Sequence, residues 1–292
     1  MYPAFFPRRE RTSLKPVAAS AVGLILSDIS NPFFAEIIRA IEECLSAVGF
    51  TTLLGNASED CTKEARLLKT MRECSPSGVL ICPSLGRDGA RTHRCGFMGA
   101  LPTVAFARPV DGVDYVGIDN VCGAELAVDH LYQIGHRRIA FVGGQAEDMA
   151  REERVEGYRR ALTRRNLPFE IEWIALSSPD RCGGYRSAID LLELKNPPTA
   201  AVCFNDLVAF GLMQALQQAD RKPGTGFGVI GFNDVPVVVH NCPLTTVDTA
   251  PRQLGEIAAE LLLRRIAKPD SLLQKVVLQP RLIVRQSCGT LS

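Results

Sequence analysis

Short runs of consecutive apolar residues alternate along this chain with stretches in which apolar residues recur at helical spacing. Residues 22–26 form the first run, Asn31 and Pro32 mark the start of a helix, and Gly49 marks its end. The apolar positions between these signals fall on one helical face: Phe34, Ile37, Ile38, Ile41, Leu45 and Val48. The segment therefore predicts a buried strand followed by an amphipathic helix.

The same alternation continues to the end of the chain. Further strands are predicted at residues 51–54, 78–82, 102–106, 116–118, 138–142, 173–176, 200–204, 228–232, 275–278 and 281–284. Helices are predicted around residues 65–71, 121–131, 151–165, 185–194, 207–218 and 254–262. Strands that are apolar throughout are buried on both faces, which favours parallel sheets covered by helices. The sequence therefore predicts an α/β fold built from right-handed βαβ units.

The chain is long enough for two such sheets. It has 292 residues, and a single core rarely grows beyond about 250–300 residues. Two lobes are therefore expected, and the tail after residue 254 can serve both, so that the chain crosses between them more than once. With 46% hydrophobic and 22% charged residues, the composition excludes extended disorder. The net charge of +1 excludes the overall electrostatic footprint of a nucleic-acid binder.

The 10 cysteines contain no Cys-x-x-Cys pair, which weakens a zinc or redox interpretation. Several lie inside apolar runs, where free cysteine behaves as a small hydrophobic residue, and their number favours a reducing compartment, the cytoplasm. Residues 17–26 follow several basic residues and could imitate a signal peptide, but the loop and helix signals after them favour a first strand. No apolar run approaches the ~20 residues of a membrane span.

An enzyme finds little support in the sequence. There is no Gly-x-Ser-x-Gly elbow, no Walker A motif and no His-Glu-x-x-His motif. Asp129 and His130 are neighbours on a helix and cannot face each other as a dyad. The pairs His93/Cys95 and His240/Cys242 lack a second pair of ligands. No catalytic activity, metal or cofactor is predicted.

Nine segments, in order and at matching spacing from about residue 20 onward, resemble the effector-binding core of the lactose/galactose-repressor (LacI/GalR) family of transcription regulators. They are residues 22–36 (VGLILSDISNPFFAE), 54–56 (LGN), 116–120 (VGIDN), 135–144 (GHRRIAFVGG), 154–158 (RVEGY), 198–206 (PTAAVCFND), 229–234 (VIGFND), 243–247 (PLTTV) and 280–288 (PRLIVRQSC). One such motif would be weak, but this ordered set is specific.

The resemblance implies a type I periplasmic-binding-protein-like fold, in which two similar lobes flank a ligand cleft and are joined by three crossovers, here near residues 119, 250 and 278. Residues 17–119 with 251–278 would form the N-terminal lobe, and residues 120–250 with 279–292 the C-terminal lobe. The family also implies a homodimer and a DNA-binding helix-turn-helix headpiece. Only about 20 residues precede the first strand, too few for such a module. Residues 1–16 are therefore expected to be a short basic segment without a complete helix-turn-helix.

The resemblance and the strand ends together predict the effector site, because ligands of βα folds bind at the carboxyl ends of parallel strands. Asp28, Asn31, Phe33 and Phe34 follow the first strand. Helix capping is at least as good an explanation for Asn31 as ligand contact, and Phe34 also continues the apolar helix face. Phe33 could stack on a sugar or another flat ring. Thr249, near the second crossover, is a weaker candidate.

Four more candidates lie after later strands. Arg108 resembles the Arg of the family's Asp-Arg pair, with Ala107 in place of the Asp, and Arg154 matches the Arg that reaches into the cleft. Asp206 is expected to cap a helix, which would leave Asn205 to face the cleft. Asn233 stands where relatives commonly have Asp. Two arginines without the usual carboxylates would make the cleft positive, which favours a sugar acid slightly over a neutral sugar.

The chain is thus predicted to be the dimerising, effector-binding core of a cytoplasmic LacI-type repressor that controls DNA binding through lobe closure. DNA would be reached only through a headpiece. The alternative is a stand-alone sugar-binding protein of the transport type, which a cleavable signal peptide would favour. A structural or inactive paralogue is a third class, against which the polar residues of the predicted cleft argue mildly.

Overall fold

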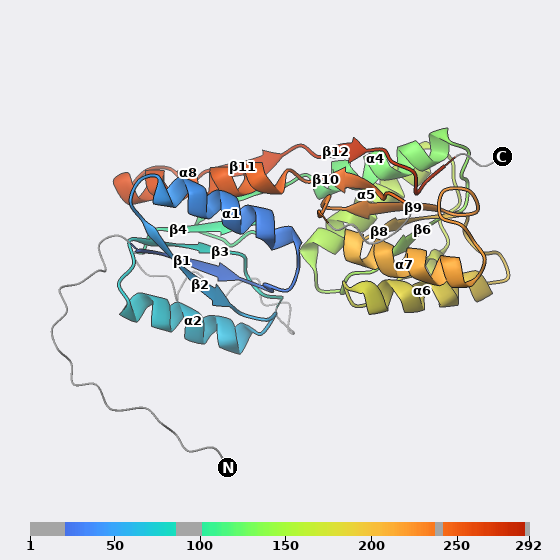
Figure 1. Cartoon of the computed structure of the whole chain (residues 1–292). Helices are drawn as coiled ribbons and strands as arrows, with labels where there is room; N and C mark the ends of the chain where they lie inside the picture. Colours follow the sequence, from blue (N-terminus) through green and yellow to red (C-terminus); the bar gives the residue numbers. More distant parts are fainter. Residues whose placement is uncertain (1–20, 86–100, 237–241, 290–292) are drawn as a thin grey trace, which may run out of the picture.

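The computed structural model describes residues 21–85, 101–236 and 242–289. The strands of the described residues form two six-stranded sheets, one in each of two lobes (Figure 1). The basic segment predicted at residues 1–16 lies outside the described residues.

The first lobe contains a fully parallel sheet with the order β11-β5-β4-β3-β1-β2. Its strands are β1 (Ala21–Leu26), β2 (Thr51–Asn56), β3 (Gly78–Ile81), β4 (Thr103–Phe106), β5 (Asp114–Ile118) and β11 (Lys275–Leu278). Helices α1 (Phe33–Ser46) and α8 (Pro251–Ala267) pack together on one face, and α2 (Cys61–Glu73) covers the other (Figure 1). Because both faces are covered, β1, β3, β4 and β5 are buried along their whole length, as their unbroken apolar runs predict.

The second lobe repeats this architecture with the order β12-β10-β9-β8-β6-β7. Its strands are β6 (Ile139–Val142), β7 (Ile174–Ala175), β8 (Ala200–Cys203), β9 (Gly228–Phe232), β10 (Thr245–Asp248) and β12 (Arg281–Ile283). The pair α4 (Asn120–Gln133) and α5 (Met149–Arg164) covers one face, and the pair α6 (Arg181–Glu193) and α7 (Asp206–Gln218) covers the other. Only β12 runs antiparallel to its neighbour β10.

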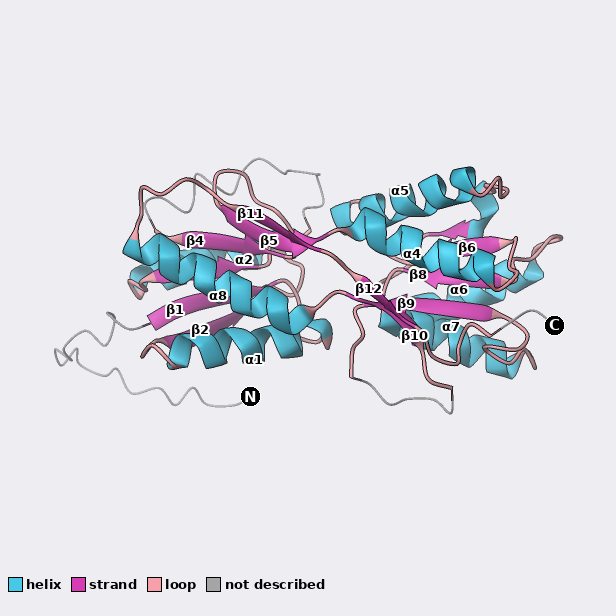
Figure 2. Ribbon diagram, turned by 90° about the horizontal axis from the view of Figure 1, so that it is seen from above, coloured by secondary structure: helices cyan, strands magenta, loops and turns pink. Residues whose placement is uncertain are grey.

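The chain passes between the two sheets three times: from β5 to α4, from β10 to α8 and from β11 to β12 (Figure 2). These passages lie side by side and leave the carboxyl ends of the parallel strands of each lobe facing the other lobe. The predicted fold class, two α/β lobes joined by three crossovers, is confirmed.

Several helices begin earlier than the sequence pattern indicates, and α5 and α6 show why. Helix α5 begins at Met149 and α6 at Arg181, and an aspartate caps each of them. In α6 the first turn contains Gly184, a residue type that disfavours helix. Here glycine is needed, because a Cβ at Gly184 would lie 2.0 Å from the carbonyl oxygen of Val208 on α7. Close packing of α6 on α7 therefore outweighs the low helix propensity.

Candidate ligand site between the lobes

A cavity of about 380 Å³ lies between the lobes and is lined by residues from both. Its size falls within the range of small-molecule sites, about 300–1,000 Å³. Eight of the nine predicted site residues line it: Asp28, Asn31, Phe33, Phe34, Arg108, Arg154, Asn205 and Asn233. They come from positions far apart in the sequence and meet because parallel strands end at a common edge.

The start of α1 forms one part of the first-lobe wall. The Asn31 side chain accepts a hydrogen bond from the backbone N–H of Phe33 (3.1 Å), so Asn31 satisfies the helix end and lines the cavity at once. Asp28 is occupied by the backbone N–H and the hydroxyl of Ser30. Phe33 and Phe34 meet edge to face with ring centroids 5.3 Å apart, and both are largely buried. This arrangement fixes an aromatic surface at the cavity.

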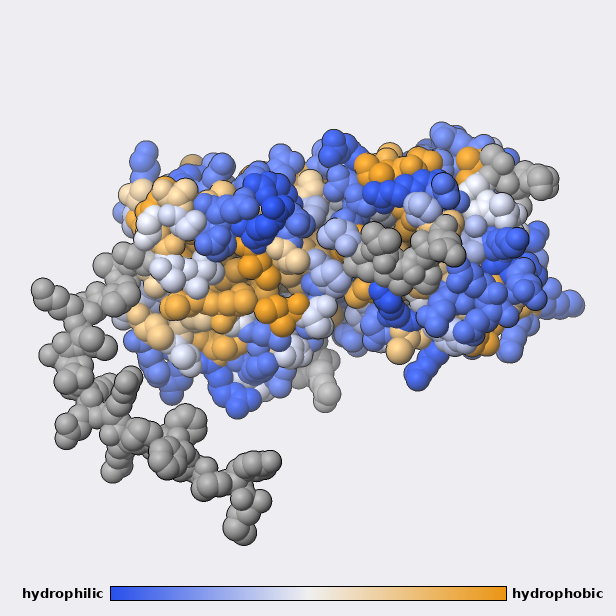
Figure 3. All heavy atoms as spheres, in the orientation of Figure 1, coloured by the Kyte–Doolittle hydropathy of each residue, from blue (hydrophilic) through white to orange (hydrophobic). Residues whose placement is uncertain are grey.

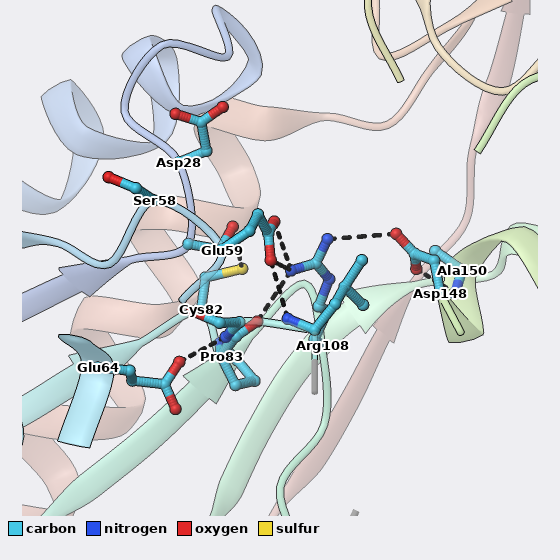
Figure 4. Close-up of polar contacts among 12 residues, drawn as sticks. Asp28, Ser58, Glu59, Glu64, Cys82, Pro83, Arg108, Asp148 and Ala150 are labelled. Atoms are coloured by element: carbon cyan, nitrogen blue, oxygen red, sulfur yellow. Dashed lines mark hydrogen bonds and ion pairs between the residues drawn. The ribbon is translucent and has the colours of Figure 1, made fainter. Parts of the chain in front are cut away.

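Arg108 crosses from the first lobe to the second. Its Nη1 donates to Glu59 (2.9 and 3.0 Å) and to the Pro83 carbonyl oxygen (2.9 Å), all within the first lobe. Its Nη2 donates to Asp148 Oδ2 (3.2 Å) in the second lobe, as Figure 4 shows. Burial alone would lower the pKa of Arg108, but the charges of Asp148 and Glu59 outweigh it and raise the pKa. Arg108 is therefore a fixed cation that links the two lobes.

Ala107, just before Arg108, has a φ of +59°, the left-handed region that an aspartate adopts more readily than alanine. Ala107 itself lines the cavity, where it contributes only a methyl group.

Arg154 forms the deepest cation of the second-lobe wall. Its guanidinium lies 3.9 Å from the Phe232 ring centroid, and it donates to Asn120 Oδ1 (2.9 Å) and to the Phe204 carbonyl oxygen. Burial lowers the pKa of Arg154 to about 10, so the side chain is still charged at neutral pH. Within the described residues no carboxylate pairs with Arg154, and its Nη2 makes no hydrogen bond.

The capping role that the sequence suggests for Asp206 belongs to Asn205. Asn205 is the N-cap of α7: it accepts from the Val208 backbone N–H (2.8 Å) and donates to the Pro179 carbonyl oxygen (2.9 Å). The prediction that Asp206 caps this helix is therefore wrong, because Asp206 is already its first helical residue. Asn205 still lines the cavity, with its side chain held in place by these two bonds.

Asn233 follows β9 in a backbone conformation with a φ of +105°, which is rare for residues other than glycine. The residue is 6% exposed and lines the cavity. Among the described residues its side-chain amide has no hydrogen-bond partner. The amide is not one of the fully buried unpaired groups, so it is open to the cavity and free to pair with a ligand.

Thr249 is not among the cavity-lining residues. It is 1% exposed, and its hydroxyl is buried without a hydrogen-bond partner among the described residues. Its position beside the second crossover places it between the lobes but behind the cavity wall.

The cavity also contains polar residues that the sequence analysis missed: Glu59, Asn120, Gln145, Asp148, Ser178 and Asp180. Asp148 and Asp180 are the N-caps of α5 and α6, and each follows a strand of the second sheet. The available signal was a polar helix cap a few residues after a strand. Their carboxylates also change the charge of the site. Four acidic residues (Asp28, Glu59, Asp148 and Asp180) line the cavity beside two arginines, so the expected positive cleft is wrong.

The described part of the chain contains no candidate metal site, no membrane-spanning helix and no ionised thiol at the cavity. No cluster of three or more metal-ligating side chains is present there, and none of its helices has the length and apolarity to cross a membrane. Burial raises the pKa of the Cys82 thiol, at the cavity wall, to about 11, which keeps it protonated.

Comparisons with known proteins identify relatives of the whole described fold. Residues 19–284 match the family model of periplasmic binding proteins and the sugar-binding domain of the LacI family. The HTH-type transcriptional repressor PurR of Mannheimia succiniciproducens is 30% identical over 290 residues, which cover 97% of this chain and 85% of the relative. Among solved structures, transcription regulator CcpA of Lactococcus lactis has a TM-score of 0.83 at 27% identity, covering 92% of this chain and 99% of CcpA. Transcriptional regulator CelR in complex with cellobiose has a TM-score of 0.82 at 27% identity, covering 93% and 86%.

Proposed function

The chain belongs to the LacI family and contains the effector-binding core of its transcriptional regulators, and we propose that its effector is a small, neutral, polyhydroxylated molecule of the sugar type. The observation that carries this proposal is the pair of unsatisfied polar groups at one cavity, the Nη2 of Arg154 and the side-chain amide of Asn233. Together they can donate to and accept from adjacent hydroxyl groups.

The rest of the cavity fits the same ligand class. Phe33 offers an aromatic ring for the apolar face of a sugar, and the caps Asp148, Asp180 and Asn205 offer further acceptors. The carboxylates outnumber the arginines, and Arg108 is already paired with Glu59 and Asp148. A strongly anionic effector would therefore meet repulsion. The cellobiose in CelR is one example of a sugar in a related protein.

Effector binding would act through the angle between the lobes. A ligand that contacts Phe33 on one lobe and Arg154 on the other binds best at one lobe angle, and only that difference in affinity shifts the population. In the family such a shift is transmitted to a helix-turn-helix headpiece and changes DNA binding. We expect this regulation to operate in the cytoplasm, where operator DNA is present.

Isothermal titration calorimetry of the full chain against neutral mono- and disaccharides and the matching sugar acids tests the proposal. At least one neutral sugar should bind, and Asn233→Ala should weaken that binding. Arg160→Ala is the matched control, because Arg160 is exposed on α5 and pairs with Glu156 away from the cavity. Binding of sugar acids alone would overturn the neutral class, and no binding by any sugar would overturn the sugar proposal itself.

A homodimer is also proposed. In the first lobe, Figure 3 shows an apolar surface over the edge strand β2, between α1 and α2. Leu54 on β2 is 46% exposed and Val48, just after α1, is 57% exposed. An exposed apolar patch over an edge strand marks an interaction site, here most simply for a second copy of the chain.

Sedimentation at micromolar concentration should give a dimer for the native chain and a larger monomer fraction for Leu54→Lys. The matched control is Leu272→Lys, which adds the same charge at a leucine that is 87% exposed before β11. A native chain that sediments only as a monomer would refute the dimer.

A further inference from the structure

Asp206 is a buried carboxylate that lies behind the cavity wall and not in it. It is the first residue of α7 and is 2% exposed. Its Oδ2 accepts from the backbone N–H of Val235 (2.7 Å), and its Oδ1 accepts from the hydroxyl of Thr246 on β10 (2.6 Å). Asp206 therefore joins the helix that begins at the cavity to the turn that follows β9.

That turn is strained. Asn233 and Asp234 have φ values of +105° and +52°, two successive residues other than glycine in a left-handed conformation. Such residues cost about 1–3 kcal/mol each and persist only where the surroundings hold them. Three contacts do so: Asn233 N–H to the Val247 carbonyl oxygen (2.8 Å), Arg285 to Asp234 (2.7 Å) and Val235 N–H to Asp206. Asp206 holds the end of the turn that presents Asn233 to the cavity.

Several groups around Asp206 act on its charge. Burial and, to a smaller extent, the neighbouring Asp234 raise the pKa of Asp206 to about 7, against the opposing effect of the bonds from Thr246 and Val235 and of the charge of Arg285. The charge of Asp206 also acts on Arg154 of α5, where it opposes the lowering of the Arg154 pKa by burial. Cys203 on β8 faces it as a neutral thiol, since burial raises the pKa of that thiol. The carboxyl is therefore balanced between its two protonation states.

We propose that Asp206 is a positioning residue: its ionised carboxylate holds the 233–235 turn and so keeps the Asn233 amide presented to the cavity. The ionised form accepts charge-assisted bonds from both Val235 and Thr246, which are roughly twice as strong as neutral ones. Protonation turns the bond from Val235 into a neutral one and loosens the turn. The presentation of Asn233 therefore weakens as the pH falls through neutrality. The inference rests on the proposed function only where it treats Asn233 as an effector contact.

Nuclear magnetic resonance of the ¹⁵N-labelled full chain without added ligand tests this directly. Between pH 8 and pH 6, the Val235 and Asn233 resonances should shift with a midpoint near 7. The hydrogen-exchange protection of the Val235 amide, corrected for its intrinsic pH dependence, should fall several-fold over the same range. In Asp206→Asn both changes should vanish, with protection at the low, acid value throughout.

Thr246→Val provides a second variant that retains the carboxylate. It removes a bond that favours the ionised form, so the midpoint should move to higher pH. Thr52→Val should leave the midpoint unchanged, because Thr52 is a half-buried threonine on β2 of the other lobe whose buried hydroxyl has no partner among the described residues. A pH profile of Asn233 and Val235 that is the same in the native chain and in Asp206→Asn would overturn the proposal. Because no sugar is added, this outcome is separate from a failure of sugar binding.

Discussion

The two lobes share one architecture, yet they face the cavity in different states. In the first lobe Asp28, Asn31 and Arg108 each have protein partners: Asp28 has Ser30, Asn31 has the start of α1, and Arg108 has Glu59 and Pro83. In the second lobe two buried residues of the wall keep polar groups without a partner among the described residues, Arg154 at Nη2 and Asn233 at its amide. The buried side chains of the second-lobe wall thus leave more of their hydrogen-bonding capacity to a ligand.

This difference divides the work between the lobes. Donors and acceptors that a bound ligand covers discriminate strongly between ligands, because a ligand that fails to match them leaves them buried and unpaired. The second lobe is therefore expected to set recognition. The first lobe contributes the Phe33 ring and the Arg108 cation, which reaches across to Asp148 and is expected to set the lobe angle.

The largest expected effect is the loss of Arg154. Arg154→Ala removes a charge-assisted contact worth roughly 1.5–3 kcal/mol, so the affinity for the best sugar of the panel should fall about tenfold to a hundredfold or more. Arg154→Lys keeps the charge but loses the planar guanidinium, so its affinity should lie between those of the native chain and Arg154→Ala. Calorimetry gives the affinities, and the fluorescence of Trp173, the single tryptophan, buried in the second lobe, checks the fold. Native affinity in a folded Arg154→Ala would remove Arg154 from the site.

Asp206, in the second lobe, also makes the stability of the folded chain depend on pH. The folded pKa of Asp206 is raised to about 7 by burial, while an unfolded aspartate has a pKa near ~3.9. Between these values the folded chain holds a proton that the unfolded chain has lost, so this contribution to stability is full below pH 4 and is lost as the pH rises to 7. From pH 5 to pH 8 the native chain should lose roughly 2–3 kcal/mol through this group.

Asp206→Asn should remove that loss. Between pH 5 and pH 8 the unfolding temperature should therefore fall less in Asp206→Asn than in the native chain. Thermal melts followed by Trp173 fluorescence at the two pH values measure it. An equal pH dependence in both chains would show that Asp206 does not titrate in this range. If Asp206 also positions the 233–235 turn, two properties of the native chain change in opposite directions as the pH rises. Asn233 is presented more firmly, whereas the folded chain becomes less stable.

Much of this division could be read from the sequence. The strand ends and the resemblance placed eight of nine predicted residues at one cavity, because βα folds bring distant strand ends together whatever their side chains. The partners of those residues could not be read. Nothing near Arg108 in the sequence indicates Glu59 or Asp148, since the contacts depend on the β2–α2 loop and on the approach of the second lobe. The charge of the cleft was therefore misjudged.

Backbone conformation was the other missing piece. The pattern at residues 229–234 predicts a strand followed by polar residues, but it does not show that Asn233 and Asp234 both take positive φ values or that Asp206 holds Val235. Asp206 read as a helix cap because aspartate favours that position. The cap is the residue before it, and the freed carboxylate acquires a long-range partner instead.

A smaller effect is expected from Phe33, the aromatic group of the first lobe. Phe33→Leu keeps an apolar side chain against Phe34 but removes the ring that can stack on a sugar. Aromatic contacts of this kind are worth about 0.5–1.5 kcal/mol, so affinity should fall by about two- to tenfold. Calorimetry on the same sugar measures it, with Phe169→Leu, an exposed aromatic residue of the second lobe outside the cavity, as the control. A larger loss than in Arg154→Ala would reverse the assignment of recognition to the second lobe.

The smallest effect, and the sharpest test of the division, concerns the link between Arg108 and Asp148. Asp148→Ser retains an N-cap acceptor for the Ala150 amide but ends the bond to Arg108. Asp180→Ser makes the same change at the N-cap of α6, whose aspartate also lines the cavity but pairs with no arginine among the described residues. The ion pair is 3.2 Å long and Arg108 keeps its ion pair with Glu59 without it, so the loss should cost about 0.5–1 kcal/mol and Asp148→Ser should lower sugar affinity about two- to fivefold. Small-angle scattering without sugar should show a larger radius of gyration in Asp148→Ser and no change in Asp180→Ser. Because Arg108 stays anchored to Glu59 and Pro83 in both variants, only the contact between the lobes differs. Equal scattering and equal affinity in the two variants would mean that Arg108 does not set the lobe angle and that the first lobe acts on the ligand only through its aromatic wall.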